Sequence, residues 1–186
     1  MPDAMITERS DARLSLARRG RGRAFDFSVA PGRDWRRALA GALDLRALES
    51  CRLTGRLVPE GREDWRLEAR LEADAIQDCA VTLAPVRTRI DEAVTRRFLA
   101  APPPPPEGGE AEMPEDDSIE PLADPVDLGD VLAEALALAL PPFPRAADAP
   151  AGARRAAPPG VSPLSDEDVK PFAGLASLMR DREGKG

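Results

Sequence analysis

WRLEARLEADA, at residues 65–75, alternates apolar and charged side chains without a break. Successive side chains of an extended strand point to opposite faces, so this segment has one apolar face and one charged face. It predicts a strand that is buried on one side only. Residues 51–57 alternate in the same way, and Val58-Pro59-Glu60-Gly61 between the two runs is typical of a turn. We therefore expect an antiparallel hairpin.

Two further segments extend this sheet. Residues 25–29 alternate apolar and polar side chains, and after Pro31-Gly32 we expect a short helix that is capped by Asp34 and ends near Gly41. Residues 79–99 are ambiguous by spacing, because the apolar positions 90, 94 and 98 fit both a strand and a helix. β-branched residues are frequent there and Pro85 would interrupt a helix, so we favour strands.

A separate apolar run, DLGDVLAEALALALPP at residues 127–142, predicts a helix. Asp127 can accept the free N–H groups of the first turn, Asp130 suits its positive end, and Pro141 ends it. An apolar stripe on one side favours burial against the sheet; docking onto a partner is the alternative. The stripe comprises Leu128, Val131, Leu132, Ala135, Leu136 and Ala139, and the opposite side comprises Gly129, Asp130, Ala133, Glu134 and Ala137. The run is too short to span a membrane, which needs about 20 apolar residues.

These patterns together predict an α+β fold in which an antiparallel sheet, open or curled towards a barrel, is packed by one amphipathic helix. We expect a single domain over residues 23–143. An acidic and proline-rich loop over residues 101–126 should interrupt it, since such sequence buries too little surface to offset the entropy of ordering. We expect residues 1–22 to be a flexible arginine-rich terminus, and residues 144–186 to be a disordered loop and C-terminal tail.

The composition limits the chemistry. The 186 residues include two cysteines, Cys51 and Cys79, and neither histidine nor tyrosine. Two thiols without further soft ligands cannot complete a structural zinc site, and the usual general base is missing. We therefore expect no metal and no cofactor, and any acid or base chemistry, as in a carboxylate-dependent hydrolase, would rest on carboxylates or on Lys170 and Lys185. The N-terminus has no continuous apolar stretch of the secretory type, so we expect a cytoplasmic protein.

Three segments in this order resemble the YceD family, the large ribosomal RNA subunit accumulation proteins: CAVTLAPV at residues 79–86, VDLGDVLAEALALALPPFP at 126–144 and KPFAGLASL at 170–178. The resemblance implies a non-catalytic ribosome biogenesis factor of bacterial type that supports accumulation or maturation of large-subunit (23S) rRNA. Many members have a second cysteine where this chain has Thr82, and a histidine and another cysteine after the helix, where this chain has Arg145. A metal or redox role is therefore not carried over.

Arginines are the candidate RNA contacts. Residues 1–100 hold 19 arginines against 16 acidic residues, and residues 101–186 hold seven basic against 17 acidic residues, so the two parts carry +3 and −10. A local arginine face can bind a polyanion even on an acidic protein. The candidates are Arg18, Arg19, Arg21 and Arg23, joined by Arg52, Arg56, Arg87, Arg89, Arg96 and Arg97 if the outer sheet face is continuous. The alternatives are a solvated N-terminus and cross-strand neutralisation by Glu68, Glu72, Asp91 and Glu92.

The acidic interval supplies a competing hypothesis. It holds four candidate contacts for a basic ribosomal protein, which could also mask the arginine face: Glu115, Asp116, Asp117 and Glu120. Most acidic loops, however, only solvate the chain. We expect large-subunit rRNA or a pre-ribosomal particle as the partner, with no membrane association. The alternative function is an acidic adaptor or chaperone for a basic ribosomal protein.

Overall fold

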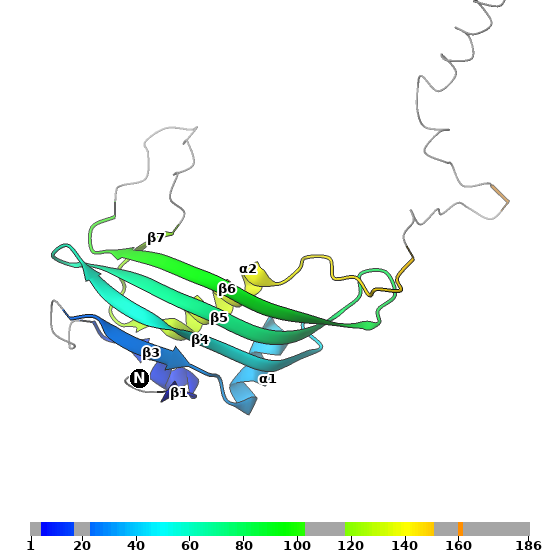
Figure 1. Cartoon of the computed structure of the whole chain (residues 1–186), viewed down its shortest axis with the longest axis horizontal. Helices are drawn as coiled ribbons and strands as arrows, with labels where there is room; N and C mark the ends of the chain where they lie inside the picture. Colours follow the sequence, from blue (N-terminus) through cyan, green and yellow to red (C-terminus); the bar gives the residue numbers. More distant parts are fainter. Residues whose placement is uncertain (1–4, 17–22, 103–117, 151–159, 162–186) are drawn as a thin grey trace, which may run out of the picture. The chain divides into compact units, whose positions relative to one another are not determined.

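The computed structural model describes residues 5–16, 23–102, 118–150 and 160–161. The chain divides into units of residues 1–149 and 150–186. Every helix and strand among the described residues belongs to the first unit (Figure 1).

The architecture is α+β, as predicted, and it is built on one large sheet. Its strands are β1 Met5–Ile6, β3 Phe25–Val29, β4 Ala47–Glu60, β5 Asp64–Asp78, β6 Pro85–Leu99 and β7 Ile119–Pro121, in the order β1-β3-β4-β5-β6-β7. The three central pairings are antiparallel, whereas the outermost strands β1 and β7 each pair in parallel with their neighbour. In the described part of the chain β1 and β7 do not pair with each other. The sheet is therefore open, and the option of a closed barrel was wrong.

The predicted hairpin is confirmed. β4 and β5 pair along their length, and Gly61 in the turn between them has a φ of +64°, a conformation that glycine adopts readily. Leu57 lies opposite Leu67, and both side chains are buried. The alternation in residues 65–75 thus sends the apolar side chains to one face and the charged side chains to the other.

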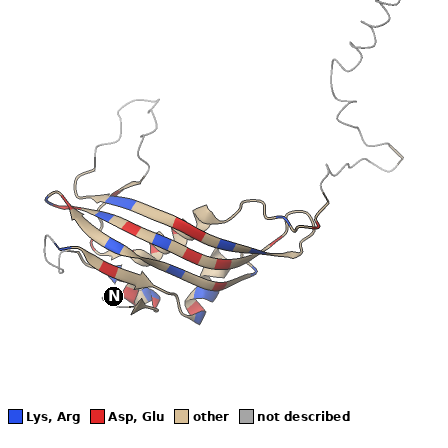
Figure 2. Ribbon diagram, in the orientation of Figure 1, with Lys and Arg blue, Asp and Glu red and all other residues tan. Residues whose placement is uncertain are grey.

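One face of this sheet is covered and the other is open. The helix α2, Leu128–Ala139, contacts β3, β5 and β6 on the covered face. The apolar side chains of the strands and of α2 form one buried core there. The open face has no covering layer among the described residues, and its strands carry basic and acidic residues along their length (Figure 2).

The sequence pattern predicted α2 well. The Asp127 carboxylate caps it by accepting the backbone N–H groups of Gly129 and Asp130 at 2.9 and 3.2 Å. The buried positions are Leu128, Gly129, Val131, Leu132, Ala135 and Leu136. Gly129, expected on the outer side, is buried because the Arg9 side chain lies over it; an added Cβ would come within 2.6 Å of Arg9 Nη1. No helix among the described residues is long and apolar enough to cross a membrane.

The first helix confirms the other helical pattern. α1 spans Arg33–Ala42, which agrees with the expected end near Gly41, but its N-cap is Gly32, and Asp34, the expected cap, lies in the first turn. Leu39 and Ala40 are buried, and the helix contacts β4.

The N-terminal segment differs from the prediction of a flexible terminus over residues 1–22. Residues 5–16 hold β1, the 3-10 turn η1 Arg9–Ala12 and the strand β2 Arg13–Leu14, which pairs antiparallel with β8 Val126–Asp127. The side chains of Ile6, Ala12 and Leu16 are buried in the core. Two-residue strands have no periodicity to detect, so no local pattern indicated them. The folded unit begins before the predicted boundary at residue 23.

Candidate nucleic-acid interface

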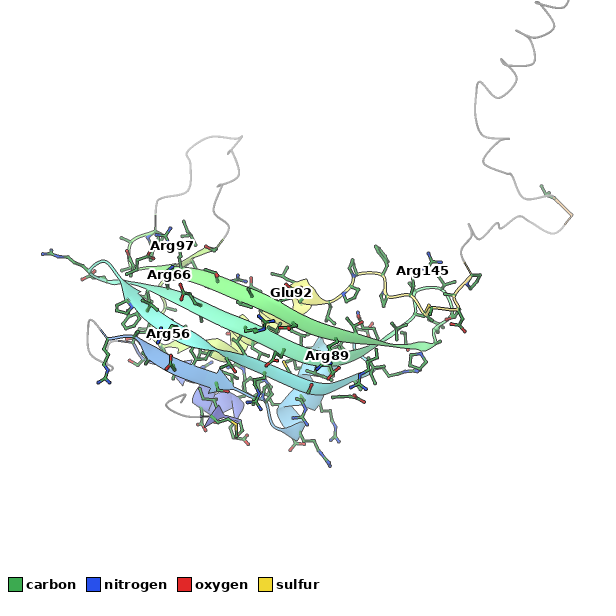
Figure 3. All side chains as sticks on the ribbon, viewed as in Figure 1. Arg56, Arg66, Arg89, Glu92, Arg97 and Arg145 are labelled. Atoms are coloured by element: carbon green, nitrogen blue, oxygen red, sulfur yellow. The ribbon has the colours of Figure 1, made fainter. Side chains whose placement is uncertain are left out.

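The open face is built from the outward side chains of β4, β5 and β6. The strand register sets Arg52, Glu72 and Asp91 in one row across the three strands. A neighbouring row holds Ser50, Asp74 and Arg89 in the same way. Arginines and carboxylates are therefore neighbours across the face, and along β5 the outward positions 66, 68, 70 and 72 alternate between arginine and glutamate. Figure 3 shows Arg56, Arg66 and Arg97 towards one end of the strands and Arg89 nearer the other.

Most arginines of this face form ion pairs within the chain. The pairs and their N–O distances are Arg56–Asp26 at 3.3 Å, Arg66–Glu68 at 2.9 Å, Arg70–Asp91 at 2.6 Å, Arg87–Glu49 at 3.0 Å, Arg87–Asp74 at 3.2 Å and Arg97–Glu60 at 3.2 Å. The hydrogen bond from Arg87 lowers the pKa of Asp74, and the bond from Arg70 lowers the pKa of Asp91. The face is consequently mixed in charge rather than uniformly basic.

Arg96 does not belong to this face. In the register of β5 and β6 it lies opposite the buried Leu67, so its side chain points to the side that α2 covers. There its guanidinium contacts Glu120 at 2.9 Å and Glu134 of α2 at 3.3 Å, and its side chain is only 15% exposed. Glu92, opposite the buried Leu71, lies on the same side. The prediction that Arg96 and Glu92 share the outer face with the other candidates was wrong.

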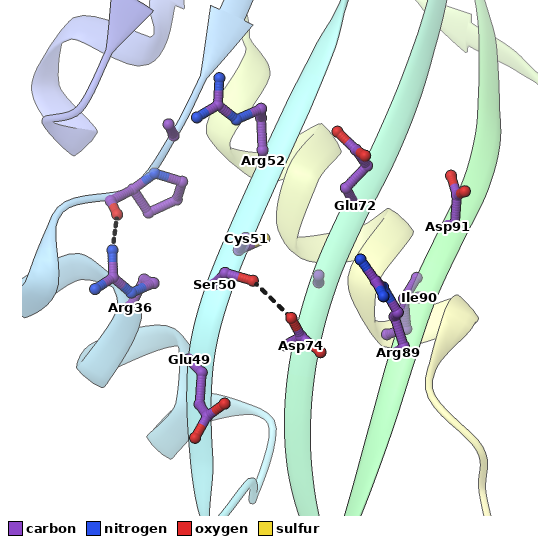
Figure 4. A pocket seen from close by; sticks show the side chains of 13 residues that line it. Arg36, Glu49, Ser50, Cys51, Arg52, Glu72, Asp74, Arg89, Ile90 and Asp91 are labelled. Carbon is purple, nitrogen blue, oxygen red and sulfur yellow. Dashed lines mark hydrogen bonds between the residues drawn. The ribbon is translucent and has the colours of Figure 1, made fainter.

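A groove of about 430 Å³ lies on the open face (Figure 4). Arg52 and Arg89 line this groove. Neither guanidinium has a carboxylate oxygen of a described residue within 4.0 Å, so neither forms an ion pair there. Ser50 donates a hydrogen bond to Asp74 at 3.3 Å, and Arg36 donates to the Pro31 carbonyl at 2.7 Å. The charged side chains of the lining are Arg36, Glu49, Arg52, Glu72, Asp74, Arg89 and Asp91. The groove thus brings together three arginines that form no ion pair with a described residue, and Arg52 and Arg89 are the two that lie on strands of the sheet.

Three arginines of the face were missed as candidates. Arg66 and Arg70 occupy the charged side of the alternating stretch 65–75, so the pattern itself could have included them. Arg36 lies on α1, and only the tertiary structure brings it to the groove.

The remaining candidates fall mostly outside the described residues. Arg18, Arg19, Arg21, Glu115, Asp116 and Asp117 lie there, whereas Arg23 is an exposed residue just before β3. Glu120 lies among the described residues and forms an ion pair with Arg96.

Burial and the nearby Glu134 raise the pKa of Glu120, and the lowering effect of Arg96 is smaller.

The two cysteines lie in different environments. Both are free and buried. Burial raises the pKa of Cys51 to about 12. Hydrogen bonds from the Thr82 side chain and from backbone N–H groups of Ala146, Thr82 and Val81 lower the pKa of Cys79 to about 6. No group of three or more histidine, cysteine or acidic residues suited to a metal ion occurs in the described part of the chain.

Comparison with known proteins gives one match. A family model described as "Large ribosomal RNA subunit accumulation protein YceD" matches residues 67–179. The match begins within β5 and includes β6, β7, β8 and α2. No curated protein and no solved structure matches the chain.

Proposed function

The chain belongs to the YceD family of large ribosomal RNA subunit accumulation proteins, and from this premise we propose that it acts by binding large-subunit rRNA, or a precursor particle that contains it, without catalysing a reaction. The observation that carries this proposal is the open sheet face with its groove, where Arg52 and Arg89 form no ion pair with a described residue. The sequence has no histidine and no tyrosine. A binding role needs neither residue.

The arginines of the open face are suited to phosphate. A guanidinium presents a planar set of N–H donors that matches two phosphate oxygens. Arg52 and Arg89 can bind a phosphate without giving up an ion pair to a described residue. The paired arginines can exchange a carboxylate for a phosphate at little cost, because exposed ion pairs contribute only about 0–1 kcal/mol.

The carboxylates beside these arginines favour RNA over a simple polyanion. An exposed carboxylate repels phosphate but accepts hydrogen bonds from a ribose 2′-hydroxyl or from the amino group of a base. In the groove, Glu72 lies between Arg52 and Asp91 in the same row. Such a surface binds a ligand whose phosphates and hydroxyls match the spacing of its arginines and carboxylates. A uniformly basic surface would bind any polyanion, whatever this spacing.

The aromatic residues indicate which RNA form the open face accepts. The outward positions of β4, β5 and β6 hold no aromatic residue. Trp65 is buried, and Trp35 is half-buried with the Arg9 guanidinium 5.8 Å from its ring centre. Recognition of single strands relies on bases that stack on aromatic rings. We therefore assign structured, base-paired RNA to this face.

Binding of this kind is enough to make rRNA accumulate. A protein that binds one folded state of the precursor selectively shifts the population towards that state. The bound state then proceeds in assembly more often than it is degraded.

The test compares two double variants of the full chain. Arg52→Glu with Arg89→Glu reverses the groove arginines, and Arg33→Glu with Arg37→Glu reverses two exposed arginines of α1 as the matched control. The groove variant should bind large-subunit rRNA more weakly and with a shallower salt dependence. Its log–log slope should fall by about 0.7–0.9 for each phosphate that an arginine no longer neutralises. The control should bind like the parent.

Depletion tests the cellular role separately. Cells without the protein should hold less mature large-subunit rRNA relative to small-subunit rRNA, and the control variant, but not the groove variant, should restore the ratio. An unchanged ratio after depletion would overturn the role in accumulation. If the groove variant binds large-subunit rRNA and restores the rRNA ratio as well as the control does, the groove on the open face is not the RNA-binding surface.

A further inference from the structure

One edge of the sheet is long, and over most of its length no described strand pairs with it. β6 pairs with β5 from Pro85 to Phe98, but with β7 only over residues 97–99. Along residues 85–95, no described backbone group bonds to the side of β6 that faces away from β5 (Figure 1), and a side-chain bond there runs from Arg96 Nη1 to the Thr95 carbonyl at 3.0 Å. An exposed strand edge of this kind is a template for a further strand.

The contacts with the β7 segment show which backbone groups face this edge. The N–H of Arg97 donates to Ser118 at 2.8 Å, and the carbonyl of Leu99 accepts from Leu122 at 2.8 Å. Backbone groups alternate along a strand, so odd-numbered residues of β6 direct their N–H and C=O groups away from β5. The free edge therefore presents the backbone groups of Arg87, Arg89, Asp91 and Ala93, whereas the carbonyl of Thr95 accepts from Arg96.

This edge lacks the usual features that prevent pairing. The only proline of β6 is Pro85 at its beginning, and the β5–β6 register has no bulge. Short length, internal proline and bulges are the common protections, and charged side chains are the remaining one. The charge pattern along β6 therefore decides what can pair with it.

That pattern is complementary to itself. Antiparallel pairing of two identical strands is symmetric about one residue, and a centre at Ile90 places Arg89 of each copy opposite Asp91 of the other. A centre at Arg89 or Asp91 sets that residue opposite its own copy, and such like charges are destabilising. A centre at residue 88 sets Arg87 opposite Arg89, and a centre at residue 92 sets Arg87 opposite Arg97. Arg89 forms no ion pair within 4.0 Å with a described residue of its own chain, and its exposed pair with Asp91 of the other copy contributes little to stability, so phosphate can still displace that pair.

We infer that two copies of this chain pair through their β6 edges, antiparallel and centred on Ile90, to form one continuous sheet. Ile90 lies on the covered side and is buried, so the two isoleucines meet below the sheet. Arg89 and Asp91 lie on the open side, where both line the groove. The dimer therefore sets two grooves side by side on one continuous open face.

The first experiment measures the mass of the nuclease-treated full chain by sedimentation equilibrium. The parent should approach twice the monomer mass as its concentration rises. Ala93→Pro removes an N–H that points to the free edge and leaves the bonds to β5 intact, so this variant should be a monomer with the parent's circular dichroism. Ala93→Thr keeps the N–H and should dimerise as the parent does.

The second experiment tests the register by charge and stays informative if Ala93→Pro does not fold. Asp91→Arg should give a monomer, and the swap Arg89→Asp with Asp91→Arg should restore the dimer, because the opposite charges face each other again. A parent that stays monomeric at all concentrations would overturn the inference. A folded Ala93→Pro variant that still dimerises would overturn it too, and a swap variant that remains monomeric would refute the Ile90 register.

Discussion

Leu132→Ala and Leu138→Ala make the same substitution in α2 in opposite environments. The Leu132 side chain is fully buried, whereas Leu138 is 74% exposed. The change in helix propensity is identical for both, so the difference between the variants isolates the contribution of burial. Truncation of a buried leucine costs about 2–5 kcal/mol, since it removes apolar contact and leaves a cavity. Truncation at the exposed position should change stability by no more than about 0.5 kcal/mol.

Urea denaturation followed by circular dichroism measures both changes. With a slope of about 2 kcal/mol per M, a loss of about 3 kcal/mol lowers the midpoint by about 1.5 M. Leu138→Ala should keep the parent's midpoint. If the two midpoints lie within about 0.3 M of each other, α2 does not pack on the sheet as described and the core is wrongly placed.

Three further predictions follow from local geometry. Gly55→Ala should destabilise the domain by about 1–3 kcal/mol in urea, because the added Cβ would lie 2.6 Å from the Cα of Ala69 in β5; Gly41→Ala in α1, where no atom lies within 4 Å, should stabilise it by up to about 1 kcal/mol. Burial alone would raise the pKa of Asp127, but hydrogen bonds, first of all that from Arg9, lower it in the folded state. The ionised Asp127 therefore stabilises the fold fully above about pH 4, the pKa of an unfolded aspartate. This stabilisation is lost as the pH falls through the lower pKa of the folded state. Asp127→Asn should therefore be less stable than the parent at pH 7, with the difference shrinking in acid titrations; a difference independent of pH would contradict this. The pKa of Cys79 is lowered from 9.0 to about 6, so the parent's stability should rise from pH 6 to pH 9, and Cys79→Ala should lose this rise in urea titrations at each pH.

The sequence predicted burial correctly where the side-chain pattern of a single strand or helix is enough to identify its buried face. The alternation in residues 65–75 and the stripe in α2 each report a single buried face, and both were confirmed. Arg96 was wrongly predicted on the outer face because the arginines of β6 were grouped together without regard to the alternation of side chains along the strand. Ile90, Val94 and Phe98 are even-numbered and buried, so alternation already placed residue 96 on their side.

Other features depend on contacts between distant residues and have no local signal. Burial of Gly129 requires the Arg9 side chain, which reaches α2 from the N-terminal segment. The neutralisation of the open face depends on the strand register, because a shift by one residue would change every cross-strand partner. The pairing of Arg70 with Asp91, for example, joins adjacent strands diagonally and is not evident from either strand alone.

The ion pair between Arg9 and Asp127 joins residues 118 positions apart. At about 5–20 residues per second, the ribosome adds the second partner roughly 6 to 24 seconds after the first. During that interval the apolar side of the β4–β5 hairpin has no helix to cover it. The nascent chain thus passes through a stage at which it needs protection from aggregation, and synthesis of α2 ends that stage.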